Sequence, residues 1–113
     1  MENCLFCKII AGEIPSAKVY EDDRVYAFRD INPQAPTHIL VVPKKHIASV
    51  ACVDEATDEE LAACLRAVRQ IAIQENLTGG YRVVSNCGDD ACQSVHHLHF
   101  HLLGGSKMAE RMS

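Results

Sequence analysis

The chain has 113 residues and a net charge of −4 with its six histidines neutral, and 48% of its residues are hydrophobic. This length fits a single domain over 1–113 with a core of its own. The acidic balance argues against a partner that is a long nucleic acid, and no apolar run is long enough to span a membrane. The first residues do not form a signal peptide, so we expect a cytoplasmic protein.

The N-terminal half predicts a short helix and a group of strands. Residues 4–12 indicate a short helical turn that ends at Gly12, and residues 17–30 indicate a β-hairpin around the turn "EDD". The run "HILVVP", residues 38–43, is typical of a buried strand that stops at its proline. Residues 44–54 are expected to be a mixed connector.

The C-terminal half predicts one long helix and two strands. Thr57 and Glu60 form a capping box, and apolar residues recur at helical spacing from Leu61 to Ala72. Residues 81–86 and 95–103 are expected to be strands, and residues 105–113 a flexible tail. Hairpin connections predict an α+β fold with a mainly antiparallel five-stranded sheet, one long helix and a short N-terminal helix.

Six cysteines in a cytosolic chain favour buried thiols or metal ligands over disulfides. Cys52, Cys64 and Cys87 have apolar or small neighbours, so we expect all three to be buried. Cys4 and Cys7 form a Cys-x-x-Cys pair, whose spacing allows both sulfurs to reach one metal ion.

Four of the six histidines fall within residues 96–101, in the stretch "QSVHHLHFHLLGG". If this stretch is a strand, His97, His99 and His101 share one face, about 6.6 Å apart, while Leu98, Phe100 and Leu102 face the core. A chance row of surface histidines is one reading. A catalytic zinc with an open position and a nucleophilic imidazole are the two functional alternatives, and spacing alone does not separate them.

The motif "HLHFHLL" resembles the signature of the histidine-triad family of nucleotide hydrolases and transferases. The stretches "KIIAGEIPS", "YEDDRVYAFRDINPQAPTHILVVPKKHI", "GYRVVSN" and "QSVHHLHFHLLGG" are similar to the Hint branch, the purine nucleoside phosphoramidases. The similarity runs from about Cys4 to Gly105. It implies the histidine-triad (HIT-like) fold for the predicted elements.

The resemblance implies cleavage of the P–N bond of nucleoside 5′-phosphoramidates through a nucleotidyl-histidine on His99. The implied catalytic residues are His97, His99, His101 and Ser94. The implied ligands are purine nucleotides: AMP, GMP, and phosphoramidate or acyl-adenylate derivatives. The implied nucleotide-binding residues are Phe6, Ile9, Asp30, Ile31, His38, Leu40, Asn86, Cys92, Gln93, Ser94, His99 and His101. Asp30 would hold the ribose hydroxyls, and Ser94 would lie near the leaving group.

The resemblance also implies a structural zinc ion on Cys4, Cys7, His46 and His97, no organic cofactor, and a homodimer formed through the long helix and a strand. His96 is a spare candidate for a metal ligand, but its side chain is expected to point away from His97. Cys92 stands where relatives commonly have glycine, and the tail lacks a Trp-Pro ending, so substrate preference is open. Two rival functions remain: a dinucleoside polyphosphate hydrolase of the Fhit branch, and a nucleotide-binding regulatory protein.

Overall fold

The structure, a computed structural model, describes residues 3–111. It confirms the predicted α+β fold, with five strands, one long helix and a short N-terminal helix. The elements in chain order are α1 (Leu5–Ile10), β1 (Lys18–Glu21), β2 (Val25–Arg29), β3 (Thr37–Pro43), the 3₁₀ helix η1 (Val50–Glu55), α2 (Asp58–Gln74), β4 (Tyr81–Val84), the 3₁₀ helix η2 (Asp89–Ala91) and β5 (Phe100–Gly104).

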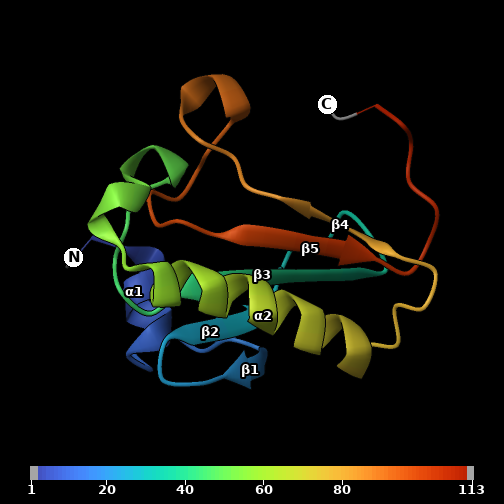
Figure 1. The fold of residues 1–113 in the computed structure, drawn as a ribbon, viewed down its shortest axis with the longest axis horizontal. Coiled ribbons are helices and arrows are strands. Elements are labelled where there is room, and N and C mark those ends of the chain that lie inside the picture. Colours follow the sequence, from blue (N-terminus) through green and yellow to red (C-terminus); the bar gives the residue numbers. More distant parts are fainter. Residues whose placement is uncertain (1–2, 112–113) are drawn as a thin grey trace.

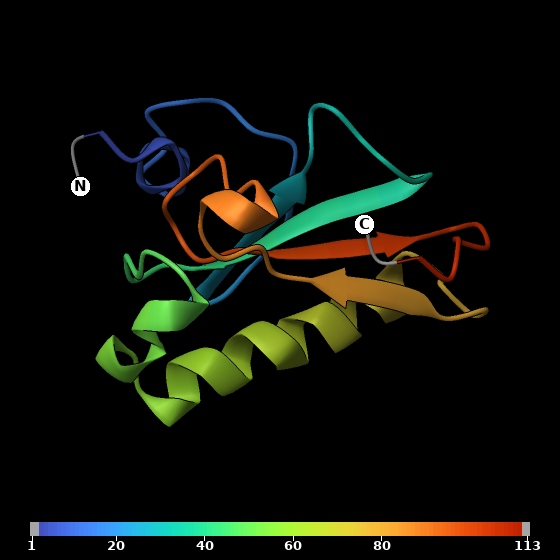
Figure 2. The same cartoon turned by 90° about the horizontal axis from the view of Figure 1, so that it is seen from above.

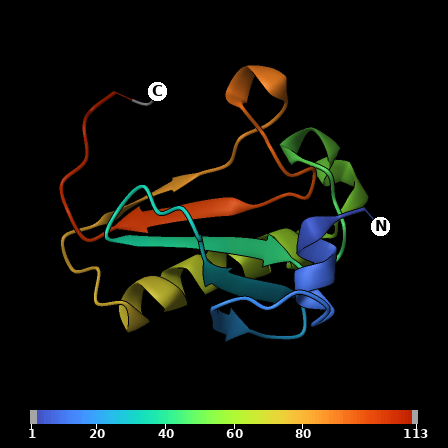
Figure 3. The ribbon, with the colours of Figure 1, turned by 180° about the vertical axis from the view of Figure 1, so that it is seen from behind.

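The five strands form one antiparallel sheet in the order β1-β2-β3-β5-β4 (Figure 1). Helix α2 covers one face, and α1 and η2 lie on the other side (Figure 2). From behind, α1 is seen in front of β2 and β3 (Figure 3). The strand order makes β3 and β5 neighbours, which brings residues 37–43 beside residues 100–104.

The two faces of the sheet follow from the alternation of side chains along each strand. On β3, Ile39 and Val41 belong to the core under α2. Leu40 and Val42 belong to a second apolar cluster that contains Phe6 and Ile9 of α1. His38 shares the side of Leu40, so β3 presents a histidine to the α1 face.

Helix α2 begins as the sequence predicts. Thr57 is its N-cap, and both bonds of the capping box with Glu60 are formed. Cys64, Val68 and Ile71 of this helix are buried against the sheet. The helix ends at Gln74, and Asn76 then takes a positive φ of 60°, so the turn begins two residues after the helix.

The last strand begins later than predicted. Residues 95–99 are irregular, and β5 pairs with β3 only from Phe100, opposite Val41. Pairing stops there because the carbonyl of Pro43 accepts a hydrogen bond from the His97 ring, and the N–H of Leu98 donates to Ile47. Leu98 and Leu102 are nevertheless buried, as the alternation predicts, and Phe100 packs partly buried against the core under α2.

The burial expected for three cysteines holds only for one of them. Cys64 is buried, Cys52 is half-buried and Cys87 is exposed. Cys52 lies in η1, within the connector, and Cys87 lies in the loop after β4, where its thiol donates to the Ser49 hydroxyl at 3.5 Å. The prediction of burial for Cys87 was wrong because small neighbours in the sequence do not reveal that this loop lies at the surface.

The tail makes at least one contact with the sheet, from the Arg82 guanidinium to the Ala109 carbonyl at 2.7 Å. Its predicted flexibility stays a prediction, and residues 112–113 lie outside the described part of the chain. Among the described residues, no helix combines the length and apolar character needed to cross a membrane.

Candidate active site and metal centre

His97 is held in a single tautomer by main-chain contacts. Its side chain is fully buried, and its Nε2 lies 2.8 Å from the Pro43 carbonyl. A carbonyl oxygen only accepts, so Nε2 carries the proton and Nδ1 keeps a free lone pair. Burial is the main cause that lowers the pKa of His97 from 6.5 to about 4, so the ring is neutral at neutral pH.

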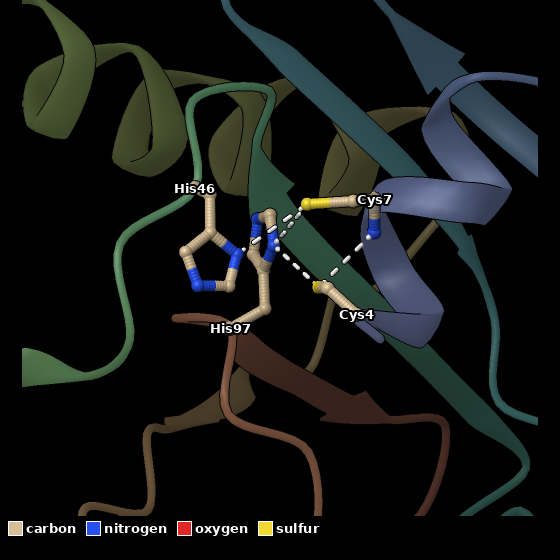
Figure 4. A group of neighbouring side chains, drawn as sticks. All are labelled: Cys4, Cys7, His46 and His97. Atoms are coloured by element: carbon tan, nitrogen blue, oxygen red, sulfur yellow. Dashed lines mark hydrogen bonds between the residues drawn. The ribbon is translucent and has the colours of Figure 1, made fainter. Parts of the chain in front are cut away.

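The free Nδ1 of His97 points into a cluster with Cys4, Cys7 and His46 (Figure 4). It lies 3.3 Å from Cys4 Sγ and 3.5 Å from Cys7 Sγ, and His46 Nδ1 lies 3.4 Å from Cys7 Sγ. All four ligand atoms lie within 4.8 Å of one another. The structure therefore brings together the four side chains that the sequence resemblance names as metal ligands, whereas His96 is exposed and outside the cluster.

The donor set of this cluster fits a tetrahedral zinc ion. Zinc takes two thiolates and two imidazoles, and ligand atoms at the usual bond lengths then lie about 3.3–3.8 Å apart. The sulfurs of Cys4 and Cys7 are neighbours because Cys4 is the N-cap of α1 and accepts the Cys7 N–H. Burial, and then Cys4, raise the pKa of the Cys7 thiol to about 11, so a cation is needed to hold this sulfur as a thiolate.

His99 is oriented by His97, the histidine whose ring lies in the Cys4–Cys7–His46 cluster. Its Nδ1 donates to the main-chain carbonyl of His97 at 2.6 Å, which leaves the lone pair on Nε2. The ring is buried, and Phe6 packs edge-on against it with centroids 5.1 Å apart. Burial lowers the pKa of His99, so the imidazole is neutral and nucleophilic at neutral pH.

His38 and His101 form a directed pair beside His99. The N–H of Gln34 donates to His38 Nδ1 at 3.0 Å, so the His38 proton sits on Nε2. This Nε2 lies 2.9 Å from His101 Nδ1 and 3.4 Å from Asp30 Oδ2. His101 thus accepts at Nδ1 and carries its own proton on Nε2, and burial with the neighbouring His99 and His38 lowers its pKa to about 4.

The residues assigned to the base and ribose occupy two different settings. Phe6, Ile9 and Leu40 are buried in the apolar cluster on the α1 face, whereas the Ile31 side chain is fully exposed. Asp30 follows β2 and accepts the Asn32 N–H at 2.8 Å through Oδ1, which is the turn contact that its place before a proline loop would also predict.

The loop between β4 and β5 carries the remaining candidates. Asn86 is half-buried, Ser94 is exposed, and Cys92 is exposed with a left-handed φ of 60°. That backbone conformation favours glycine, which explains why the resemblance has glycine at this position. An open hollow of about 760 Å³ is lined by Ser94 and His46 among others, but not by His99 or His101.

Several contacts of the site were not predicted. The carbonyl of Pro43 and the N–H of Gln34 set the tautomers of His97 and His38, and main-chain groups leave no signal in a sequence. The Ser85 hydroxyl donates to the His99 carbonyl at 2.8 Å. Ser85 directly follows β4, and the strand pattern of 81–86 did not distinguish it.

Comparisons with known proteins identify the family of this chain. The family model described as HIT domain matches residues 11–108. The chain belongs to the HIT-domain family. It is 54% identical over 106 residues to the "14 kDa zinc-binding protein" of Zea mays, covering 92% of this chain and 83% of that protein.

Two further relatives carry names that describe an activity. The chain is 46% identical over 106 residues to "Adenylylsulfatase HINT1" of Arabidopsis thaliana, covering 92% of this chain and 72% of that protein. The structure named "HIT family hydrolase" from Clostridium thermocellum superposes on this HIT-domain protein with a TM-score of 0.95 at 46% identity, covering 100% and 99% of the two chains.

Proposed function

We propose that this HIT-domain protein hydrolyses the P–N bond of purine nucleoside 5′-phosphoramidates through a nucleotidyl-His99 intermediate. The observation that carries the proposal is the hydrogen bond from His99 Nδ1 to the His97 carbonyl, which leaves Nε2 as the free, neutral nucleophile. A nucleophilic imidazole divides one difficult displacement into two easier ones.

In the first step, His99 Nε2 attacks the α-phosphorus, the P–N bond breaks and the amine leaves with a proton that solvent supplies. The neutral His101 carries its proton on Nε2, so it is suited to donate a hydrogen bond to a phosphoryl oxygen. Ser94 supplies a hydroxyl on the leaving-group side. In the second step, water attacks phosphorus, the bond to His99 breaks and the nucleoside monophosphate leaves.

His38 and Asp30 help to keep His101 in the form that donates from Nε2. His38 Nε2 donates to His101 Nδ1 at 2.9 Å, so the proton of the neutral His101 ring stays on Nε2. Burial lowers the pKa of His38, and the Asp30 carboxylate, whose Oδ2 lies 3.4 Å from His38 Nε2, opposes this by attracting the proton to that nitrogen. The free lone pairs of Asp30 are suited to paired ribose hydroxyls.

Zinc on Cys4, Cys7, His46 and His97 would have four protein ligands and no open position, so its role would be structural. Of these ligands, His97 matters most for the reaction because its carbonyl orients His99. The name of the maize relative supports the metal, and the donor distances fit it.

A homodimer accounts for apolar side chains that this chain leaves exposed. Leu65 and Ile73 of α2 are 56% and 58% exposed, and Tyr81 and Val83 lie on β4, at the edge of the sheet. Pairing of two β4 edges would extend the sheet and cover an open edge, which favours association.

The test is intact-protein mass spectrometry after rapid mixing with adenosine 5′-phosphoramidate. The parent should gain one adenylyl group transiently and release AMP, while His99→Ala should form no adduct and lose more than about 10³-fold in kcat. His96→Ala is the matched control, because His96 is an exposed neighbour in the same row. AMP release by the parent without an adduct in rapid-quench samples would contradict the covalent route.

Other outcomes of the same assay favour other functions. Preferential turnover of a dinucleoside polyphosphate would favour the Fhit-type activity, and AMP binding without any turnover would favour a regulatory protein. Adenylyl sulfate belongs in the panel because of the name of the Arabidopsis relative, and its reaction at His99 would follow the same two steps with sulfate leaving.

A further inference from the structure

Gln93 is a buried polar residue whose side chain is fully engaged inside the protein. It is 7% exposed. Its Nε2 donates to the Ala48 carbonyl at 2.8 Å and to the Val95 carbonyl at 3.0 Å, and its Oε1 accepts the Gly88 N–H at 2.9 Å. These three bonds join the loop after β4, the segment after His46 and the approach to β5.

The orientation of the Gln93 amide is set by its partners. A flipped amide would place NH₂ against the N–H of Gly88 and its oxygen against two carbonyls, so only one arrangement satisfies all three contacts. Both N–H donors are used, and no donor remains for a phosphoryl oxygen. This differs from the nucleotide-binding role that the sequence resemblance implies for Gln93.

The bond from Gln93 to Val95 spans one residue, Ser94. The main chain is therefore held on both sides of Ser94: Gln93 is anchored to Gly88 by side chain and main chain, and Val95 is anchored by its carbonyl. The Ser94 side chain itself is exposed and accessible to a ligand. The Gln93 amide thus limits where the Ser94 hydroxyl can lie.

We propose that Gln93 is a positioning residue that acts through Ser94, holding its hydroxyl on the leaving-group side without contacting the phosphate. This inference rests on the proposed phosphoramidase function. It assigns to Gln93 an effect on kcat and on leaving-group dependence, and no effect on the affinity for AMP.

A double-mutant cycle tests the inference. Gln93→Met keeps the side-chain length but removes all three bonds, and should lower kcat for adenosine 5′-phosphoramidate by about 10- to 100-fold, because a misplaced group at a reaction centre costs that much. In the Ser94→Ala background the same change should lower kcat by less than about threefold. The affinity for AMP, measured by calorimetry, should stay within about threefold of the parent value.

The leaving group provides a readout that a purely structural role would not change. Across phosphoramidates of increasingly basic amines, Gln93→Met should steepen the fall of kcat, as Ser94→Ala does, because both weaken help to the departing amine. Gln74→Met, at an exposed position of α2, is the matched control and should leave kcat and the slope unchanged. The proposal would be overturned if Gln93→Met lowered kcat by the same factor in the parent and in Ser94→Ala and also weakened AMP binding. That result would favour direct contact of Gln93 with the phosphate.

Two safeguards keep the result interpretable. Gln93→Asn, which keeps an amide but is one methylene shorter, should give an intermediate loss if Gln93→Met does not fold. In the parent protein, AMP titration should leave the side-chain NH₂ resonances of Gln93 unshifted, and a large shift would contradict the assignment without any mutation. If the parent neither binds AMP nor releases it from the phosphoramidate, the proposed function fails. Hydrogen exchange of the Gln93 side-chain amide would then still measure how firmly its hydrogen bonds hold the loop.

Discussion

The pair formed by His38 and His101 predicts a specific loss of stability in acid. In the folded chain His38 Nε2–H donates to His101 Nδ1, so protonating His101 at Nδ1 would place two N–H groups against each other in a buried site. Burial, His99 and His38 lower the pKa of His101 from 6.5 to about 4. Because the folded state binds this proton less readily than the unfolded state, the stability is complete above pH 6.5 and is lost as the pH falls toward 4.

The magnitude follows from the two pKa values. With 6.5 for the unfolded chain and about 4 for the folded chain, His101 alone removes about 0.8 kcal/mol from the free energy of unfolding at pH 6 and about 2 kcal/mol at pH 5. These two values are upper limits, because water and local rearrangement relieve part of the cost of protonating His101 in the folded chain.

The assay is urea unfolding followed by circular dichroism at pH 7, 6 and 5, at one protein concentration and one metal content, for the parent and His101→Asn. The asparagine does not titrate, so the stability difference between parent and variant should change by about 2 kcal/mol from pH 7 to pH 5, with the parent losing more. His96→Asn, at an exposed position, should leave the pH dependence of the parent unchanged. A difference between parent and His101→Asn that is independent of pH would refute the reasoning.

Three further results are expected. Cys92→Gly should raise the free energy of unfolding by up to about 1 kcal/mol, because φ is 60° at this position and glycine adopts that conformation without strain. Cys92→Val should lower it by about 1 kcal/mol. A Cys92→Gly variant that is less stable in urea than the parent would contradict this. Cys7→Ser should reduce zinc, measured by elemental analysis of protein never exposed to chelator, to well under one ion per chain, whereas Cys52→Ser, outside the cluster, should not; well under one zinc per chain in the parent itself would refute the metal site. Ile73→Glu should convert a dimer to a monomer in analytical ultracentrifugation by placing a charge in the proposed interface, and identical sedimentation of variant and parent would argue against α2 as the contact.

Much of the fold was accessible from local signals. The capping box of Thr57 and Glu60 and the helical spacing after it located α2, and the turn between two β-rich runs located the β1–β2 hairpin. These signals work because the interacting groups are close in the chain. The start of β5 was wrong because it depends on partners far away: the His97 ring takes the Pro43 carbonyl, 54 residues earlier.

The sequence by itself determined which chemistry is available: a Cys-x-x-Cys pair, three alternating histidines, and a core pattern that turns those histidines to one face. Only the tertiary structure decided how that chemistry is arranged. The tautomers of His97, His99 and His38 follow from main-chain carbonyls and N–H groups, which every residue carries and no residue type reveals. The same reason decides the partners of Gln93: its amide can bind an anion or a carbonyl, and the folded chain supplies the carbonyls of Ala48 and Val95.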